Sequence, residues 1–359
     1  MRPIWILLSI LILIVSFQYQ NIAAFIGIEL ALKGFQELDR NSDGHIQKSE
    51  WPGLGFSLVD LNGDNIASKD ELKEFIKEFS REFSWQNDVN ERYDLPDQLK
   101  KRSFVSSSMS IPVGYYIYIP DSYNKQPQKR FRTVYYLHGG RPGNEARSVY
   151  VSNFIHTIFK DNSIEPALYI FVNGGELSHY NSEQKDSNGE DIFIKELIPH
   201  IDSKYRTINH RSSRGLEGFS QGGRGATRYM FKYPELFSTV SAGGGSYMIE
   251  KLIQKNDGFE DDPRDDDQEI YYVGKGNDAW SLAKDYKVSK EHKIKFLLWS
   301  GELDPNLTSI QEYAAYLNQL EIDHSLFVLD GVEHNPFAFY GKAGENLIRF
   351  HLGALAEVD

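Results

Sequence analysis

The chain has 359 residues, of which 40% are hydrophobic and 13% aromatic, so intrinsic disorder and collagen-like or low-complexity fibres are excluded. Its formal net charge of −12 argues against nucleic acid as the main partner, because binding to phosphates requires a basic surface. It contains no cysteine, which excludes disulfides, thiolate zinc sites and a cysteine nucleophile.

The N-terminal segment, residues 4–17, is apolar except for two serines and follows the positively charged Arg2. As a helix it would span about 21 Å, short of the ~30 Å hydrocarbon core of a bilayer, which is typical of the apolar region of a signal peptide. Ala23 and Ala24 supply small residues for cleavage, although the residues before them fit a cleavage site less well. An uncleaved membrane anchor and a buried core helix are the alternatives. We therefore expect residues 1–24 to direct export, to the periplasm, the extracellular space or a membrane-anchored position.

A calcium-binding loop is indicated by residues 39–50, which read DRNSDGHIQKSE and match the template D-x-[DN]-x-[DN]-G-x5-E at every fixed position. Calcium prefers six to eight oxygen ligands, so acids and amides at alternate positions suit it. Gly44 permits the sharp turn, and Ile46 is expected to pack between loops. The expected ligands are Asp39, Asn41, Asp43, His45 through its backbone carbonyl, Gln47 directly or through water, and Glu50 as a bidentate carboxylate.

A second, weaker loop follows at residues 60–71, DLNGDNIASKDE. Asn65 replaces the turn glycine, which it can partly imitate because it tolerates left-handed φ, and Ala67 replaces the packing isoleucine. The two loops resemble the EF-hand family, which predicts a small all-α EF-hand pair over residues 25–85, compressed because few residues separate the loops. A helix–loop region without calcium is the alternative. The expected ligands of this loop are Asp60, Asn62, Asp64, Ile66 through its carbonyl, Ser68 and Glu71.

The polar stretch 86–103 is expected to be a linker, and beyond it the pattern changes to short β-rich runs alternating with helical stretches. This alternation predicts an α/β domain over residues 104–359, with a mostly parallel central sheet flanked by helices. The acidic run 257–269 is interpreted as a surface loop rather than a metal site. Strands are predicted at 113–119, 132–138, 167–173, 214–220, 293–301 and 325–329, and helices at 191–205, 222–234 and 308–320.

A candidate nucleophile, Ser220, lies in GFSQG (218–222), which matches G-x-S-x-G and stands between a predicted strand and a predicted helix. Such a sharp turn exposes the serine at the carboxyl edge of the sheet, where the backbone amide of Gln221 can face a developing oxyanion. A glycine-rich turn without chemistry is the alternative.

A serine needs a base, and a strand-end loop can deliver one. His334 follows the strand 325–329, whereas the other downstream histidines are placed less well: His292, His324 and His351. The acid that orients the base is expected after the preceding strand, where Asp304 is preferred over Glu302.

The second oxyanion donor is expected in YYLHGGRPG (135–143), where an apolar strand ends in flexible glycines. Gly139, Gly140 or Arg141 are the candidate donors, and His138 is interpreted as a scaffold residue rather than a base.

Together, five segments resemble the esterase D family of α/β-hydrolases, which includes feruloyl and acetylxylan esterases, enterochelin esterases and mycolyltransferases. They are YYLHGGRPG, 189–208, 214–245, SGELDP and VEHNPFAFY, and the resemblance covers about 104–355. It implies an α/β-hydrolase fold, a triad of Ser220, Asp304 and His334, and an oxyanion hole from Gln221 and the loop after His138. Many relatives have Met at the position of Gln221, which changes the polarity of the pocket but not the backbone donor.

We therefore expect an exported serine carboxylester hydrolase that forms an acyl-enzyme, binds Ca²⁺ in its N-terminal module and needs no organic cofactor. The resemblance favours acyl esters of carbohydrates, feruloyl or acetyl, as small molecules or attached to polysaccharide. Two alternatives are an acyltransferase using the same triad and a non-catalytic calcium-binding protein. Contact with a membrane is expected only through an uncleaved N-terminal anchor.

Overall fold

The computed structural model describes residues 35–36, 38–50, 59–60, 64–73, 83–89, 94–161, 164–182, 187–247, 259–260, 271–289 and 292–353. The expected export segment, residues 1–24, lies outside them. The chain divides into two compact units, one of Met1–Glu82 with Glu333–Asn335 and one of Phe83–Val332 with Pro336–Asp359. Within the described ranges, no helix has both the length and the apolarity needed to cross a bilayer.

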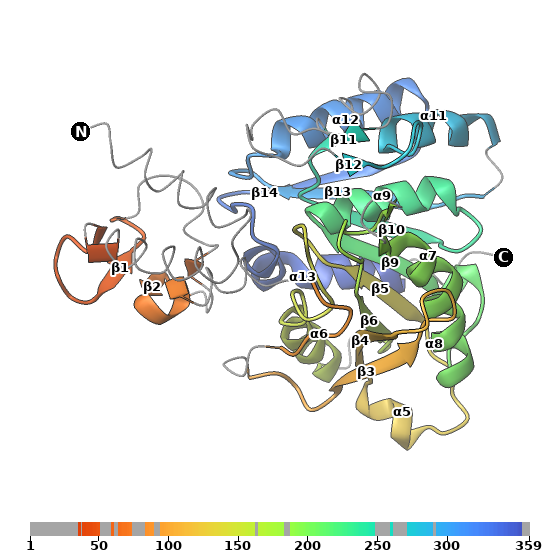
Figure 1. Ribbon diagram of the computed structural model, residues 1–359, viewed down its shortest axis with the longest axis horizontal. Helices are drawn as coiled ribbons and strands as arrows, with labels where there is room; N and C mark the ends of the chain where they lie inside the picture. The colour runs from red at the N-terminus through yellow and green to blue at the C-terminus, as the bar shows by residue number, and fades with distance from the viewer. Residues whose placement is uncertain are drawn as a thin grey trace. The chain divides into compact units, whose positions relative to one another are not determined.

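The first unit pairs its two acidic loops through short strands, β1 (His45–Gln47) and β2 (Ile66–Ser68), which run antiparallel (Figure 1). Ile46 lies opposite Ala67 at the centre of this pairing, and both are fully buried. They belong to a small hydrophobic core with Phe35, Leu38, Val59 and the partly buried Leu72. Packing between the loops is therefore as the sequence predicts, although through a two-stranded β contact.

The second unit is built on an 8-stranded sheet. Six neighbouring strands are parallel, while β4 pairs antiparallel with both β6 and β3. In order across the sheet, the strands are β14 (Ser325–Leu329), β13 (Lys295–Gly301), β10 (Thr239–Gly243), β9 (Arg214–Phe219), β5 (Thr133–Leu137), β6 (Leu168–Val172), β4 (Pro112–Tyr118) and β3 (Leu99–Val105).

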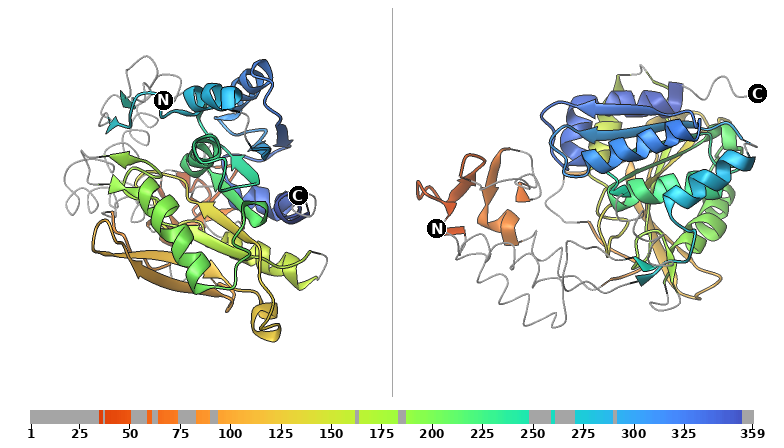
Figure 2. Two further views of the ribbon diagram at one scale, coloured as in Figure 1. Left: turned by 90° about the vertical axis from the view of Figure 1, so that its right-hand side faces the viewer. Right: turned by 90° about the horizontal axis from the view of Figure 1, so that it is seen from above.

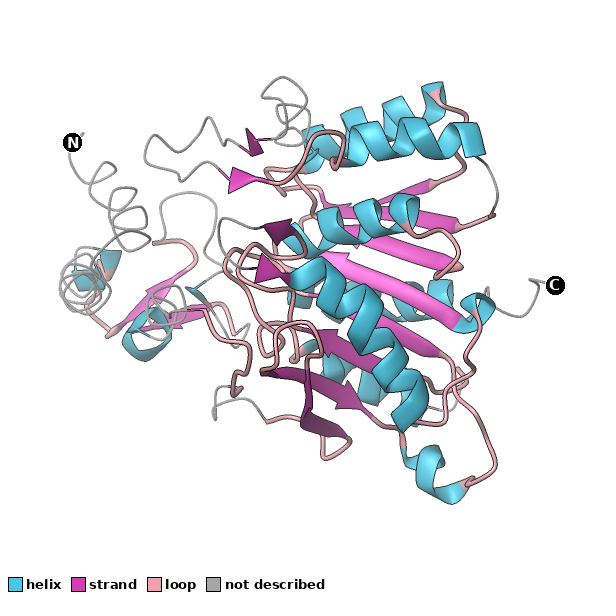
Figure 3. Ribbon diagram, turned by 45° about the vertical axis from the view of Figure 1, so that its right-hand side comes forward, coloured by secondary structure: helices cyan, strands magenta, loops and turns pink. Residues whose placement is uncertain are grey.

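Helices cover both faces of this sheet (Figure 2 and Figure 3). One core contains α6 (Val151–Lys160) and α13 (Pro336–Gly353). The other contains a π-helical turn, η2 (Ile192–Leu197), and α8 (Ile198–Lys204), α9 (Gln221–Lys232), α11 (Ala279–Ser289) and α12 (Leu307–Gln319). Successive strand residues point to opposite faces, so Tyr135 packs in the second core and Tyr136 in the first.

Shorter elements complete the described part of this unit. They are α5 (Asp121–Lys125), β7 (Asn181–Ser182), β8 (Ser187–Asn188), α7 (Gly189–Asp191), η3 (Arg211–Ser213), β11 (Phe259–Glu260) and β12 (Tyr271–Tyr272).

The predicted parallel sheet between helices is confirmed, with two strands that the sequence did not indicate. The expected linker 86–103 contributes to β3, a strand at the edge of the sheet in which Lys100, Arg102, Ser103 and Val105 are exposed and only Phe104 is buried. An edge strand that faces water shows no apolar run, and charged residues there protect the open edge. The other missed strand, β10, reads TVSAG and is buried although its residues are small.

The order of the strands reverses between β5 and β9. From β5 the chain moves to β6 on one side, and it then returns to place β9, β10, β13 and β14 on the other side. In open α/β sheets a crevice forms outside the carboxyl ends of the strands at such a reversal. The loops that follow β5 and β9 are therefore the expected location of a site.

Candidate active site

Ser220 stands at the turn between β9 and α9. Its backbone has φ 59° and ψ −120°, a conformation that a non-glycine residue rarely adopts. Its N–H donates to Gly243 O at 2.7 Å, and its carbonyl accepts from Arg224 N at 3.0 Å. Strain of this kind is typical of the nucleophile turn of α/β-hydrolases, and here the side chain remains partly exposed.

Two glycines let the loop after β5 approach this turn. A Cβ at Gly222 would lie 2.0 Å from Leu137 O, so only glycine allows α9 to start against the end of β5. A Cβ at Gly139 would lie 3.1 Å from the Cβ of Ser220. The backbone after His138 is therefore in close contact with the candidate nucleophile.

His138 is fully buried and uses its ring to fix backbone atoms. Its Nε2 accepts from Gly174 N at 3.0 Å, and its Nδ1 lies 3.2 Å from Gly139 O. The pKa of His138 lies well below the usual range, mainly because the ring is buried and secondly because His179 is close to it. The ring is therefore neutral. With Nε2 accepting, Nδ1 carries the proton and donates to Gly139 O.

The side chain of Gln221 is held by Arg224, whose guanidinium donates to its carbonyl oxygen and lies 3.4 Å from Ser246 O. The side chain of Gln221 is therefore fixed on α9, while its backbone amide is the group that the sequence assigns to the oxyanion.

Within the second unit, the loop after β13 contacts the loop after β14. The N–H of Leu303 donates to Val332 O at 2.9 Å, two residues before His334. Asp304 is 4% exposed, and its Oδ1 accepts from Asn306 N at 2.8 Å. Asp304 follows the carboxyl end of β13, and His334 follows that of β14, the adjacent parallel strand.

Two of the other downstream histidines, His351 and His324, contact core or backbone groups away from the carboxyl ends of the strands. His351 is fully buried, with Nδ1 2.9 Å from Thr239 Oγ1 and Nε2 3.3 Å from Glu217 Oε2. The hydroxyl of Tyr340 donates to the other oxygen of Glu217. His324 precedes β14, where its Nδ1 is 2.9 Å from Ile322 O.

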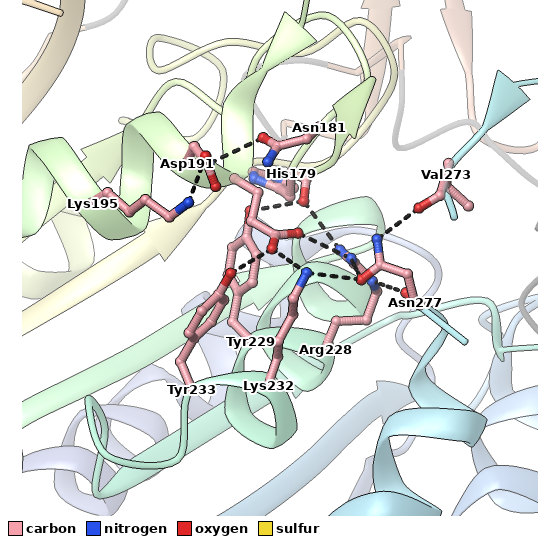
Figure 4. Close-up of polar contacts among 11 residues, drawn as sticks. His179, Asn181, Asp191, Lys195, Arg228, Tyr229, Lys232, Tyr233, Val273 and Asn277 are labelled. Atoms are coloured by element: carbon pink, nitrogen blue, oxygen red, sulfur yellow. Dashed lines mark hydrogen bonds and ion pairs between the residues drawn. The ribbon is translucent and has the colours of Figure 1, made fainter. Parts of the chain in front are cut away.

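A buried polar cluster that links α9 to the segment after β6 was not predicted from the sequence (Figure 4). Arg228 is fully buried, and its guanidinium contacts His179 O at 3.1 Å and Glu190 Oε2 at 3.2 Å. Burial raises the pKa of the Glu190 carboxyl, but Arg228 and Lys232 outweigh it and hold the pKa below its usual value. These residues come from separate elements and follow no local pattern, so no signal identified them.

Glu145, another buried acid, ties the segment before β3 to the rest of the second unit. Its carboxylate accepts from Asn87 N at 2.7 Å, Asn87 Nδ2 at 2.9 Å and Asn173 Nδ2 at 2.7 Å. Burial raises the pKa of Glu145, while these hydrogen bonds act in the opposite direction.

In the first acidic loop the carboxylates accept hydrogen bonds from the loop backbone. Asp39 Oδ2 accepts from Gly44 N at 2.9 Å, and Glu50 accepts from Arg40 N and Gln47 N, each at 3.0 Å. The bond from His45 N lowers the pKa of the Asp43 carboxyl.

In the second loop Asp60 Oδ2 accepts from Asn65 N at 2.9 Å, whereas Asn62 lies outside the described residues. Both loops thus fold around their first carboxylate. Across the part of the chain that the structure describes, three or more acidic or histidine side chains do not gather into a metal-binding group.

Two protein families match this chain, one in each of its two units. Residues 106–326 match the family described as "Putative esterase", and residues 32–51 match an EF-hand family. An esterase of Mycobacterium tuberculosis is 26% identical over 147 residues, which are 40% of this chain and 31% of that protein. An endo-1,4-beta-xylanase/feruloyl esterase of Xylanibacter ruminicola is 24% identical over 182 residues, 47% of this chain and 24% of that protein. The chain therefore spans less than a third of these relatives.

Solved structures show the same fold. A ferulic acid esterase superposes with a TM-score of 0.59 at 20% identity, covering 72% of this chain and 98% of that one. An S-formylglutathione hydrolase of Staphylococcus aureus superposes with a TM-score of 0.57 at 15% identity, covering 71% and 98%. The fold is that of the α/β-hydrolases, and because the family match extends over more than half of the chain, this protein belongs to that esterase family.

Proposed function

We propose that the protein is a serine carboxylester hydrolase with Ser220 as its nucleophile. The observation that carries the proposal is the strained turn at Ser220, placed at the carboxyl end of β9 where the strand order reverses. A serine hydroxyl there can reach an ester carbonyl in the crevice. Membership of the esterase family supports the same reaction class.

His334 is the proposed base and Asp304 the acid that orients it. His334 takes the proton of Ser220 as the hydroxyl attacks, and gives it to the leaving alkoxide. Water then hydrolyses the acyl-enzyme with His334 again as base. Asp304 is supported over Glu302 by burial, because Glu302 is exposed and accepts a hydrogen bond from Gly331 N at 3.0 Å.

The proposed oxyanion hole combines the amide of Gln221 with one amide of the loop after His138, that of Gly139, Gly140 or Arg141. Two backbone donors in a water-poor site stabilise the negative oxygen of each tetrahedral intermediate. The close approach of Gly139 to Ser220 supports this placement.

For the substrate we propose an acyl ester of a carbohydrate, feruloyl or acetyl. Feruloyl esterases occur among both the relatives in sequence and the similar structures. The apolar segment 4–17 supports the further proposal that the enzyme acts outside the cytoplasm.

Calcium is the proposed ligand of the N-terminal module, held by the carboxylates and amides of residues 39–50 and 60–71. Support comes from the template match, from the turn residues Gly44 and Asn65 at φ 86° and 65°, and from the pairing of β1 with β2. Calorimetric titration of the full chain with CaCl₂ should show binding that Asp39→Ala weakens. Absence of heat and of any calcium-induced rise in Tm would refute it.

The catalytic proposal is tested by labelling with a fluorophosphonate and by hydrolysis of a panel of feruloyl, acetyl and p-nitrophenyl esters. Wild type should be labelled and active, and Ser220→Ala should lose both. Ser203→Ala, which changes an exposed serine on α8, is the matched control and should resemble wild type. Equal labelling of wild type and Ser220→Ala would reject the assignment of the nucleophile.

A further inference from the structure

In the loop after β5, three consecutive backbone carbonyls face side-chain hydrogen-bond donors. His179 Nε2 lies 2.9 Å from His138 O, His138 Nδ1 faces Gly139 O, and the hydroxyl of Ser178 donates to Gly140 O. We propose that His179, with Ser178, is a positioning residue that orients the oxyanion-hole amides through the carbonyls of His138 and Gly140. The inference rests on the proposed function of Ser220.

The geometry of the peptide bond turns this contact into an effect on the amides. In a trans peptide the C=O and N–H groups point in opposite directions. The cis bond of this loop joins Arg141 to Pro142, beyond the three peptides concerned. Fixing the carbonyls of His138 and Gly140 toward His179 and Ser178 therefore directs the N–H groups of Gly139 and Arg141 away from them. The carbonyl of Gly139, held by the ring of His138, fixes the N–H of Gly140 in the same way. Gly139 lies against Ser220.

His179 is itself held by the helix that begins at the nucleophile. Its backbone carbonyl accepts from Arg228 Nη1 at 3.1 Å and from Tyr229 Oη at 2.7 Å, and both donors belong to α9 (Figure 4). The same helix starts at Gln221, whose amide is the other proposed donor. One rigid element thus sets the position of both parts of the oxyanion hole.

The surroundings of the imidazole define which nitrogen donates. Its Nδ1 has no hydrogen-bond partner among the described residues, which leaves the proton on Nε2, where His138 O accepts it. A Cβ at Gly225 would come within 3.1 Å of the ring, and a Cβ at Gly174 within 2.4 Å. The ring therefore has little room to turn, and its donor keeps one direction.

The test compares two substitutions of His179 in the full chain, with p-nitrophenyl acetate as substrate. His179→Leu removes the donor at similar size, and His179→Gln offers an amide N–H at the position of Nε2. We expect His179→Leu to lower kcat about tenfold or more, and the rate of fluorophosphonate labelling equally, with KM within about twofold of wild type, because an oxyanion donor acts in the transition state. His179→Gln should restore most of kcat. Equal losses in both variants would indicate packing alone and overturn the inference.

A second substitution covers the case in which His179→Leu fails to fold. Ser178→Ala removes one oxygen, and with it the donor to Gly140 O. It should lower kcat several-fold at unchanged KM, and a kcat equal to wild type would then decide against the inference. Ser220→Ala, assayed alongside, separates a failure of the proposed function from a failure of this inference alone. Full activity in Ser220→Ala rejects the proposed function and this inference with it, whereas normal kcat in His179→Leu beside an inactive Ser220→Ala rejects the inference alone.

Discussion

Lowering the pH from 7 to 5.5 should destabilise the hydrolase unit through His179. Burial is the main cause that lowers the pKa of His179, to about 3, and nearby arginines, Arg228 among them, add to it; the hydrogen bond to His138 O opposes them. In the unfolded chain a histidine has a pKa of about 6.5. Between these values the unfolded state binds more protons than the folded state, so stability falls as the pH drops through 6.5 and continues to fall until about pH 3.

The size of the effect follows from the two pKa values. Between pH 7 and 5.5, the linkage relation gives a loss of about 1.2 kcal/mol from His179 alone. Below pH 6 the loss approaches about 1.4 kcal/mol per pH unit. For a domain of this size, about 1 kcal/mol corresponds to roughly 2–4 °C in Tm. The pKa of His138 is lowered as well, so its contribution has the same sign.

The assay is denaturant unfolding at pH 7 and at pH 5.5 of wild type, His179→Gln and His292→Gln. His179→Gln cannot titrate, so its loss of stability between the two pH values should be smaller than that of wild type by about 1.2 kcal/mol. His292→Gln, at a partly exposed position, is the matched control for replacing one histidine by glutamine. A loss in His179→Gln as large as in wild type would refute the reasoning.

Three further substitutions test packing and hydrogen bonding in the second unit. Gly222→Ala should destabilise the fold by about 1–3 kcal/mol and lower esterase activity, because its Cβ would meet Leu137 O at 2.0 Å and neither backbone can yield freely. Gly341→Ala, on the exposed side of α13, should instead stabilise by about 0.5–1 kcal/mol, and equal Tm values for the two variants would contradict the argument. Tyr340→Phe should cost about 1–3 kcal/mol in urea unfolding at pH 7, because it removes a hydrogen bond to the buried carboxylate of Glu217; an unchanged midpoint would show that the bond contributes nothing.

Most strands of the sheet could be predicted because they contain runs of apolar, β-branched or aromatic residues. The predicted 325–329 is β14 itself, and the other predicted strands differ from the observed ones by a few residues at most. By contrast, β3 reads LKKRSFV, and its charged residues face water at the edge of the sheet. No periodicity in the chain marks such a strand, because its pairing with β4 depends on a neighbour rather than on its own pattern.

The strained turn that carries Ser220 could be predicted for a related reason. The turn at Ser220 is local, so the glycines that it requires lie within a few residues of it. The cluster of His179, Glu190 and Arg228 is assembled from a loop after β6, the start of a helix and the middle of α9. Each of these residues alone looks like an ordinary polar residue, and only the fold brings them together.

The large number of tyrosines does not by itself identify a binding pocket. The chain has 21 tyrosines, and a sugar-binding or aromatic pocket is one use for them, but many are buried within the sheet instead. Tyr136 and Tyr169 belong to the core beneath α6 and α13, and burial raises their pKa values well above normal, so both remain neutral hydroxyls. A pair of rings contributes about 0.5–1.5 kcal/mol beyond the area it buries, which is reason enough for them to occupy a wide sheet. The abundance of tyrosine therefore reflects packing of the sheet, and the substrate has to be identified from the residues around Ser220.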